Sequence, residues 1–289
     1  MARSQLQASK ALNRRQLLLT LAGAAVASPV LAAEPPLALS GRMVQGGFAL
    51  GRTTPRAQID LDGQSISRAS AAGLFVIGFD RDSPAQTNLR VTTPQGSAIR
   101  TLSVAPGNFD IQRISGLAND QVSPSDPALL ARIAAEVRRK AVGFESNVDS
   151  DNFHDGFVLP VVGARQSARF GGQRILNGEP RRPHYGADLA ATTGTPVRAP
   201  AAGIVSFAES DLHFEGALVL IDHGQGLISC YLHLSRVDVV HGQSVARGAL
   251  IGAVGARGRA TGPHLCWRLK WHGRNLDPML MIGARAPVA

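Results

Sequence analysis

The feature that most restricts the fold of this chain is a series of short apolar runs in its C-terminal half, separated by glycines and polar turns. The runs cover residues 197–207, 217–222, 227–234, 249–254 and 265–271. None of them places apolar residues at the spacing of a helix face. Short strands at this density predict an antiparallel, β-rich domain over residues 157–282.

The region from residue 39 to residue 120 also alternates short apolar-polar segments with turn residues. One turn signal is Asp62-Gly63, and another is the segment 94–96, which lies between two alternating runs. This spacing predicts a small antiparallel β-sandwich. Because the region contains no histidine, no cysteine and no cluster of acids, we interpret it as a packing or binding module without chemistry of its own.

A single helix is predicted between these two β regions, over residues 125–142. Ser125-Asp126-Pro127 provides a polar cap followed by an early proline. Leu130 and Val137 belong to an apolar stripe at helical spacing, which we expect to pack on a domain. The polar segment 145–153 is expected to be a linker. The predicted fold is therefore mainly β, with a sandwich, a connecting helix and a C-terminal domain.

Residues 1–32 have the pattern of an export signal. A basic start is followed by an apolar run over 17–26, with Val30 and Ala32 at the spacing of a cleavage site. The pair Arg14-Arg15 resembles a twin-arginine signal, and an ordinary secretory signal with two arginines is the alternative. No other apolar run is long enough to span a membrane. We expect a periplasmic or otherwise extracytoplasmic protein without a membrane span.

The net charge of the chain is +9, but four of these positive charges lie in residues 1–32, so the rest carries about +5. That excess suits an anionic cell-wall or membrane surface. There is no basic helix and no interleaving of aromatic and basic residues, so we expect no nucleic-acid partner.

The segment His184-Tyr185-Gly186-Ala187-Asp188 places an imidazole and a carboxylate four residues apart. Both groups can bind zinc. In a straight strand they would lie about 13 Å apart, too far for one ion, so the chain must turn between them. Pro183 and Gly186 favour a kinked loop, in which the glycine supplies the necessary freedom in φ.

Three further segments follow this motif in a particular order. They are Gly194-Thr195-Pro196 with the run to Val205, then Tyr231-Leu232-His233-Leu234, then Gly262-Pro263-His264-Leu265-Cys266. With the first motif, this order closely resembles the lysostaphin-like zinc metallopeptidases of family M23, also called the LytM type. The resemblance covers residues 157–278. No His-Glu-x-x-His segment occurs, which excludes thermolysin-like zinc peptidases as a template.

The resemblance implies a Zn²⁺ cofactor and a set of site residues. His184 and Asp188 match two of the family's zinc ligands. The third ligand in the family is the second histidine of a His-x-His strand, and this chain has Cys266 at that position. His233 and His264 match the histidines that flank the zinc-bound water in the family, so they are the implied catalytic residues.

Three interpretations of Cys266 remain open from the sequence. Strand alternation places residues 264 and 266 on one face, and a thiolate is a good zinc ligand. The site could instead be degenerate and bind no metal, as in family members that activate amidases. A disulfide with Cys230 is the third interpretation. The same alternation predicts Cys230 on the face of Leu232, opposite His233 and away from the site.

The function implied by the resemblance is zinc-dependent hydrolysis of peptide cross-links in bacterial peptidoglycan, with stem peptides as the substrate. A His, Asp and Cys set cancels the +2 charge of zinc, so we expect slower or more selective hydrolysis than with two histidines. The alternative is a catalytically degenerate LytM factor that binds the cell wall and regulates a peptidoglycan amidase.

Overall fold

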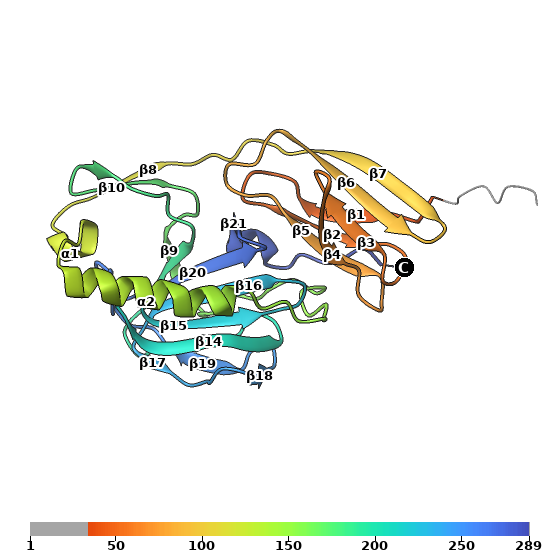
Figure 1. Cartoon of the computed structure of the whole chain (residues 1–289). Coiled ribbons are helices and arrows are strands. Elements are labelled where there is room, and N and C mark those ends of the chain that lie inside the picture. Colours follow the sequence, from red (N-terminus) through yellow and green to blue (C-terminus); the bar gives the residue numbers. More distant parts are fainter. Residues whose placement is uncertain (1–33, 289) are drawn as a thin grey trace, which may run out of the picture. The chain divides into compact units, whose positions relative to one another are not determined.

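The computed structural model describes residues 34–288, all of which belong to one compact unit of the chain (Figure 1). The fold is mainly β, as the sequence predicts. The export signal predicted at residues 1–32 lies outside the described residues. Within the described part, no helix has both the length and the apolarity needed to cross a bilayer.

Two antiparallel sheets form the N-terminal part, as a sandwich requires, with strand orders β1-β2-β5 and β4-β3-β6-β7. Their bounds are β1 Ala38–Arg42, β2 Phe48–Arg52, β3 Gln58–Leu61, β4 Gln64–Arg68, β5 Leu74–Gly78, β6 Gln86–Thr93 and β7 Gly96–Ser103. Asp62 and Gly63 connect β3 to β4 and both have positive φ. Two such residues match the twist of a tight hairpin, which explains the Asp-Gly signal.

A long helix follows these sheets. The intervening elements are β8 Ile111–Ile114 and α1 Asn119–Val122, and the long helix is α2 Pro127–Phe144. The carboxylate of Asp126 caps α2 by accepting a hydrogen bond from the backbone N–H of Leu129 at 2.7 Å. The helix therefore begins where the sequence predicts.

The buried face of α2 differs from the prediction. Leu130 and Val137 remain 45% and 54% exposed, whereas Glu136 and Gly143 are buried. The carboxylate of Glu136 accepts hydrogen bonds from Arg132 and from the backbone N–H of His213. The helix is thus held in part by a buried carboxylate, and only part of its apolar stripe packs.

The C-terminal part is built on an eight-stranded sheet with the order β18-β14-β15-β16-β20-β12-β9 and with β21 paired to β20. Its strands are β9 Arg165–Ala168, β12 Ala187–Ala190, β14 Gly203–Leu212, β15 Gly216–Asp222, β16 Leu227–Leu234, β18 Ser244–Val245, β20 His264–Trp271 and β21 Arg274–Leu276. All of these pairings are antiparallel.

Two small sheets and a short helix complete the fold. One sheet has the order β13-β19-β17, and in the other β8 pairs in parallel with β10, which also pairs with β11. The remaining bounds are β10 Gln173–Leu176, β11 Glu179–Pro180, β13 Pro196–Arg198, β17 Arg236–Val237, β19 Leu250–Ala253 and the 3₁₀ helix η1 Pro278–Met281.

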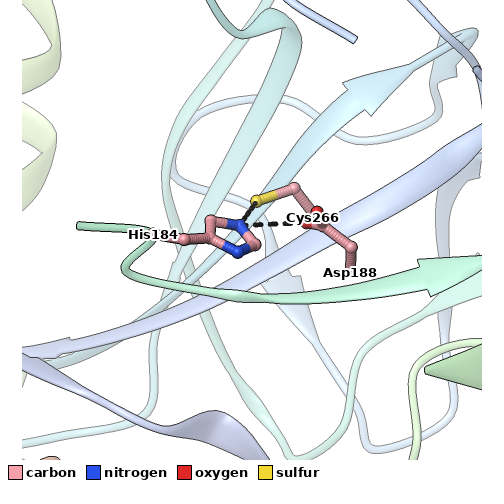
Figure 2. Close-up of side chains that lie close together, drawn as sticks. All are labelled: His184, Asp188 and Cys266. Carbon is pink, nitrogen blue, oxygen red and sulfur yellow. Dashed lines mark hydrogen bonds and ion pairs between the residues drawn. The ribbon is translucent and has the colours of Figure 1, made fainter. Parts of the chain in front are cut away.

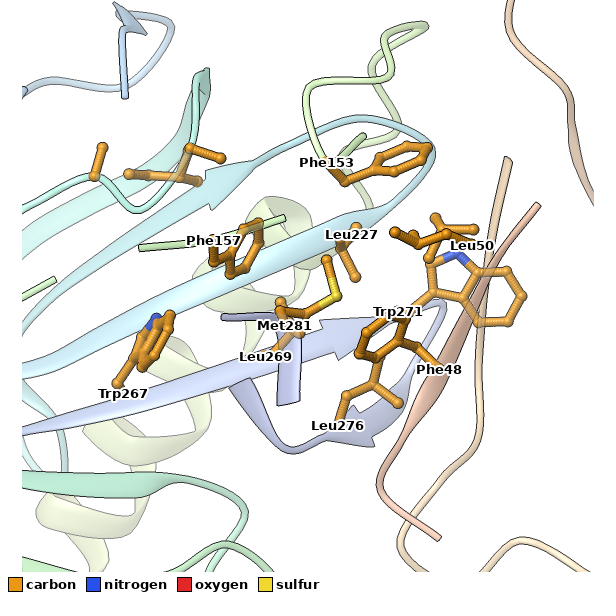
Figure 3. Packing of buried hydrophobic residues seen from close by; sticks show 14 of the residues in the cluster. Phe48, Leu50, Phe153, Phe157, Leu227, Trp267, Leu269, Trp271, Leu276 and Met281 are labelled. Atoms are coloured by element: carbon orange, nitrogen blue, oxygen red, sulfur yellow. The ribbon is translucent and has the colours of Figure 1, made fainter. Parts of the chain in front are cut away.

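The two faces of the β15-β16-β20 sheet have different surroundings. One face, here called the core face, carries Tyr231, Trp267 and Trp271, which are fully buried in the main hydrophobic cluster (Figure 3). The opposite face, here called the helix face, carries Leu232 and Cys266 in a second, smaller cluster against which Phe144 of α2 packs.

The main cluster also includes residues of the N-terminal sheets. Phe48 and Leu50 of β2 are labelled with Trp271 and Leu276 in the packing of Figure 3. A Cβ atom at Gly78 would lie 2.9 Å from the methyl groups of Leu276, so glycine permits this close approach.

A β-bulge interrupts the alternation of β16 at His233. Leu232 belongs to the cluster on the helix face, yet Leu234 belongs to the main cluster on the core face. The register with β15 shifts at this point, and His233 has a positive φ of 66°. The bulge therefore changes which face each following side chain takes.

Candidate metal centre

His184 lies in the loop between β11 and β12 and is almost completely buried, with 1% of its surface exposed. Its backbone N–H donates to the carbonyl of Gly172, and its own carbonyl accepts from Gly171. These two bonds attach the loop to the segment before β10. The chain turns after His184, as its distance from Asp188 requires, and Asp188 then lies on β12.

Position 186 requires glycine because there is no room in this loop for a Cβ atom. A Cβ atom at this position would lie 2.8 Å from Arg268 Cγ, 2.9 Å from the carbonyl oxygen of Trp267 and 3.1 Å from Cys266 Sγ. Its φ is not among the positive values of the chain. The sequence-based explanation, freedom in φ, was therefore wrong, and the glycine instead lets the loop approach β20 closely.

Three possible metal donors converge at this position (Figure 2). His184 Nε2 lies 3.0 Å from Asp188 Oδ1 and 3.3 Å from Cys266 Sγ. The three donor atoms all lie within 4.8 Å of one another, and all three residues are buried. Asp188 and Cys266 are direct partners in the β12-β20 ladder, so strand pairing holds these two donors together.

The protonation of this group follows from its charges. Burial alone would raise the pKa of Asp188, but His184, His264 and Arg174 hold that pKa well below its usual range. Burial opposes a charge on His184, yet Cys266 and Asp188 raise its pKa above the ordinary value. Asp188 is thus an ionised carboxylate, and the imidazole lies in a field that favours a positive charge.

His233 and His264 lie beside the donors, with their ring centres 4.9 Å apart. Nδ1 of His233 lies 2.8 Å from the carbonyl oxygen of Arg257, and Nδ1 of His264 lies 2.8 Å from that of Gly262. A neutral ring that donates from Nδ1 keeps a lone pair on Nε2. Burial lowers the pKa of both rings, that of His233 to about 4, so both are neutral at pH 7.

Two arginines contact the donors and were missed by the sequence analysis. Arg268 Nε donates to Cys266 Sγ at 3.4 Å, and Arg174 Nη2 lies 3.7 Å from Asp188 Oδ2. Arg268 is two residues after Cys266 on one strand, so alternation alone could have identified it. No such signal exists for Arg174, which reaches the site from β10.

Cys230 lies nearer to the centre than alternation suggested. Leu232 pairs with Cys266 and Cys230 pairs with Arg268, so both cysteines lie on the helix face. Cys230 therefore shares a face with Leu232, as predicted, but this is also the face of Cys266, so the inference that Cys230 points away from the site was wrong. That inference assumed strict alternation up to His233, where the bulge interrupts β16. Both thiols are free, and burial raises the pKa of Cys230 to about 12, which keeps it a neutral thiol.

A small cavity of about 40 Å³ adjoins the donors. Asp188, His233 and His264 line one side of it, and Ile114 and Leu117, from the segment before α2, line another. This space accommodates about one water molecule or one ion, since a water occupies about 30 Å³ of liquid.

The C-terminal part of the chain matches a known family. The model of peptidase family M23 matches residues 182–278, which include the three donors and both histidines. The chain is 42% identical over 97 residues to the peptidoglycan DD-endopeptidase ShyA of Vibrio cholerae, covering 34% of this chain and 22% of that protein. It is 38% identical over 122 residues to the DD-carboxypeptidase/endopeptidase Mpg of Neisseria meningitidis, covering 42% and 28%. The chain thus spans less than a third of each of these curated relatives.

A solved structure extends the similarity to most of the chain. The crystal structure of a Pseudomonas aeruginosa protein described as a peptidase M23 aligns with a TM-score of 0.66 and 31% identity. The alignment covers 84% of this chain and 96% of that protein, so it includes the N-terminal sheets as well as the C-terminal domain. The chain therefore belongs to peptidase family M23.

Proposed function

We propose that this protein is a zinc-dependent endopeptidase that hydrolyses peptide cross-links of bacterial peptidoglycan. The observation that carries the proposal is the convergence of His184, Asp188 and Cys266, with two neutral histidines beside them. Peptidoglycan is the substrate named for the Vibrio relative, and endopeptidase activity is named for both curated relatives described above.

The three donors fit a zinc ion. Bonds of about 2.0–2.3 Å at tetrahedral angles separate ligand atoms by about 3.3–3.7 Å. The separations of 3.0 Å to Asp188 and 3.3 Å to Cys266 require only a small opening around His184 Nε2. Oδ1 of Asp188 is buried and lies 3.0 Å from His184 Nε2, so both atoms can bind one metal once Nε2 is unprotonated.

The roles of the chain's own residues follow from their positions. Zn²⁺ bound here would supply a Lewis acid for the scissile carbonyl and would lower the pKa of the attacking water. His233 Nε2, unprotonated at pH 7, accepts the proton of that water. His264 Nε2 lies 3.7 Å from Asp188 Oδ1 and also has a lone pair, so it can accept a hydrogen bond from the attacking water, and it stabilises negative charge on the substrate only after it has taken up a proton.

The thiolate changes the electrostatics of the centre. A set of imidazole, carboxylate and thiolate is formally neutral with zinc, so it activates water less than a set with two imidazoles. The hydrogen bond from Arg268 Nε to Cys266 Sγ withdraws part of the thiolate's electron density and partly offsets this effect. We therefore propose a slow or selective peptidase that acts outside the cytoplasm, where the signal in residues 1–32 would deliver it.

Zinc content and hydrolysis test the proposal together. Purified protein is expected to contain about one zinc per chain and to cleave cross-linked sacculi. Cys266→Ala should lose both properties, whereas Cys230→Ala, which removes the other buried thiol of the same face, should keep the zinc. The proposal fails if Cys266→Ala retains zinc and activity, or if the wild-type protein has neither.

A second candidate function is a non-catalytic factor that binds the cell wall and regulates an amidase. The contacts of Arg268 with Cys266 and of Arg174 with Asp188 favour it, because they give both side chains a polar partner without a metal. In that case the purified protein would contain no zinc, would not cleave sacculi, and would raise the activity of a peptidoglycan amidase added to the same sacculi.

A further inference from the structure

A cavity of about 710 Å³ lies next to the metal centre, between α2, the loop 181–185 and the helix face of β16 and β20. Its volume is in the range of cavities that bind small ligands. Apart from Lys140, six basic side chains line it: Arg174, Arg181, Arg182, Arg259, Arg268 and Lys270.

The basic charge of this cavity is largely uncompensated. Glu215 is the single acidic residue in its described lining, and it forms an ion pair of 2.6 Å with Lys140. Of the six other basic groups, only Arg174 forms an ion pair with a described carboxylate, that of Asp188. Bringing like charges together without counter-charges is unfavourable in a partly buried space, and an anionic ligand would relieve it.

Neutral groups hold several of these side chains in place. Arg259 Nη1 donates to the carbonyl of Gln121 at 3.1 Å, and Arg181 Nη2 donates to the hydroxyl of Ser123. Nε of Arg181 and Nε of Arg174 are buried and have no hydrogen-bond partner among the described residues. Guanidinium groups that are fixed but not neutralised are ready to bind carboxylates or phosphates.

The floor of the cavity is apolar. Leu218, Leu232 and Cys230 form it from the sheet, and Phe144 and Val137 contribute from α2. This lining explains why Val137 can remain exposed on α2. A space with a basic wall and an aliphatic floor fits a short peptide with carboxylates and small apolar side chains better than a flat polyanion or a membrane surface.

The cavity shares part of its wall with the small cavity at the metal centre. Arg174, Leu176 and Arg259 line both this space and the small cavity that contains Asp188 and His233. At about 40 Å³ the small cavity is too small for a peptide. The residues of a substrate next to the scissile bond can therefore lie in the larger cavity.

We propose that this basic cavity binds the free carboxylates of a peptidoglycan stem peptide and thereby positions the adjacent amide at the metal centre. The identity of the peptide rests on the proposed function. The preference for an anionic ligand rests on the basic lining of the cavity alone. Its recognition chemistry is multivalent, with guanidinium and ammonium groups pairing with at least two carboxylates.

Equilibrium binding to the purified full chain tests the proposal, measured by calorimetry with and without zinc. The probes are a stem tetrapeptide, the same peptide with its free carboxylates amidated, and inorganic pyrophosphate. We expect amidation to weaken binding at least about 30-fold, and Arg181→Gln and Lys270→Gln to weaken binding of the acidic peptide about fivefold each. Arg90→Gln, which removes an exposed charge from β6, should change nothing.

Equal binding of the amidated and acidic peptides would overturn the proposal, and so would unchanged affinity in both cavity variants. Binding of pyrophosphate without binding of the tetrapeptide would also overturn it and would indicate a phosphate ligand. Calorimetry measures binding without hydrolysis, so the two proposals can fail separately. If the purified protein contains no zinc but binds the peptide through its carboxylates, the proposed zinc peptidase is refuted and the binding of carboxylates by this cavity is supported. If the protein hydrolyses cross-links but binds the amidated and acidic peptides equally, the peptidase proposal stands and only the proposed role of the basic cavity is refuted.

Discussion

The two faces of the β15-β16-β20 sheet differ in the polar groups that they carry and in the partners of those groups. On the core face, Ser229 hydroxyl oxygen lies 2.6 Å from His223 Nε2 and 2.7 Å from the Tyr231 hydroxyl, so the polar atoms satisfy one another. On the helix face, Cys266 lies among the candidate metal ligands, and Arg268 lies among basic side chains that mostly have no carboxylate partner among the described residues. The same strands thus provide a mainly apolar interior on one side, where only the indole N–H groups of Trp267 and Trp271 lack a partner among the described residues of the core face, and a strongly basic site on the other.

The largest effect is expected from a truncation on the core face. Trp267→Ala should lower the free energy of unfolding by about 4 kcal/mol, because a fully buried indole is lost and the surrounding packing cannot close the space. Lys270→Gln, on the helix face of the same strand, should cost less than about 1 kcal/mol. Denaturant unfolding measures both variants, and equal losses would abolish the distinction between the faces.

A change on the helix face should affect chemistry and leave folding intact. His233→Asn removes the imidazole but tolerates the positive φ at this bulge, since asparagine adopts left-handed conformations readily. Cross-link hydrolysis should fall about 100-fold, in the range for loss of a general base, while zinc content stays the same.

His272→Asn is the matched control for this change. His272 also has a positive φ, but it lies in the turn between β20 and β21 and lines neither cavity. Its activity should equal that of the wild type. Loss of zinc in His233→Asn, or equal losses of activity in both variants, would contradict the role of His233 as a base.

The smallest effect is a pH dependence that arises on the core face. Burial lowers the pKa of His223 to about 4, whereas an unfolded histidine titrates near 6.5. Below pH 6.5 the unfolded chain therefore binds a proton that the folded chain excludes. The free energy of unfolding thus decreases as the pH is lowered from 6.5 to about 4. The loss at pH 5 should be about 2 kcal/mol relative to pH 7.5.

His223→Gln isolates this contribution. The free energy of unfolding is measured for the wild type and the variant at pH 7.5 and at pH 5. The contribution of His223 is the change with pH in the wild type minus the change with pH in the variant. Asp277, whose pKa burial raises to about 6, contributes with the opposite sign, because its folded form keeps a proton that the unfolded form releases. Its contribution is common to both proteins and cancels. Identical pH dependences would show that His223 titrates normally in the fold.

Local patterns predicted much of the fold, and the resemblance to family M23 predicted which residues would form the candidate donor set. Alternation on β20 correctly placed residues 264 and 266 on one face, and Asp126 correctly marked the start of α2. Contacts between distant segments decided the rest. Neither the bulge at His233 nor the approach of Arg174 has a local signal, since the first depends on register with β15 and the second on strand β10.

The direct pairing of Asp188 with Cys266 separates the geometry of the centre from its chemistry. Backbone hydrogen bonds of the ladder place residue 266 beside the carboxylate, so its position along the strand does not depend on which side chain it carries. Only His184 is supplied by a loop. If the proposed zinc is bound, such a ladder would let a single substitution at position 266 change the acidity of the metal while the pairing of β12 with β20 is kept.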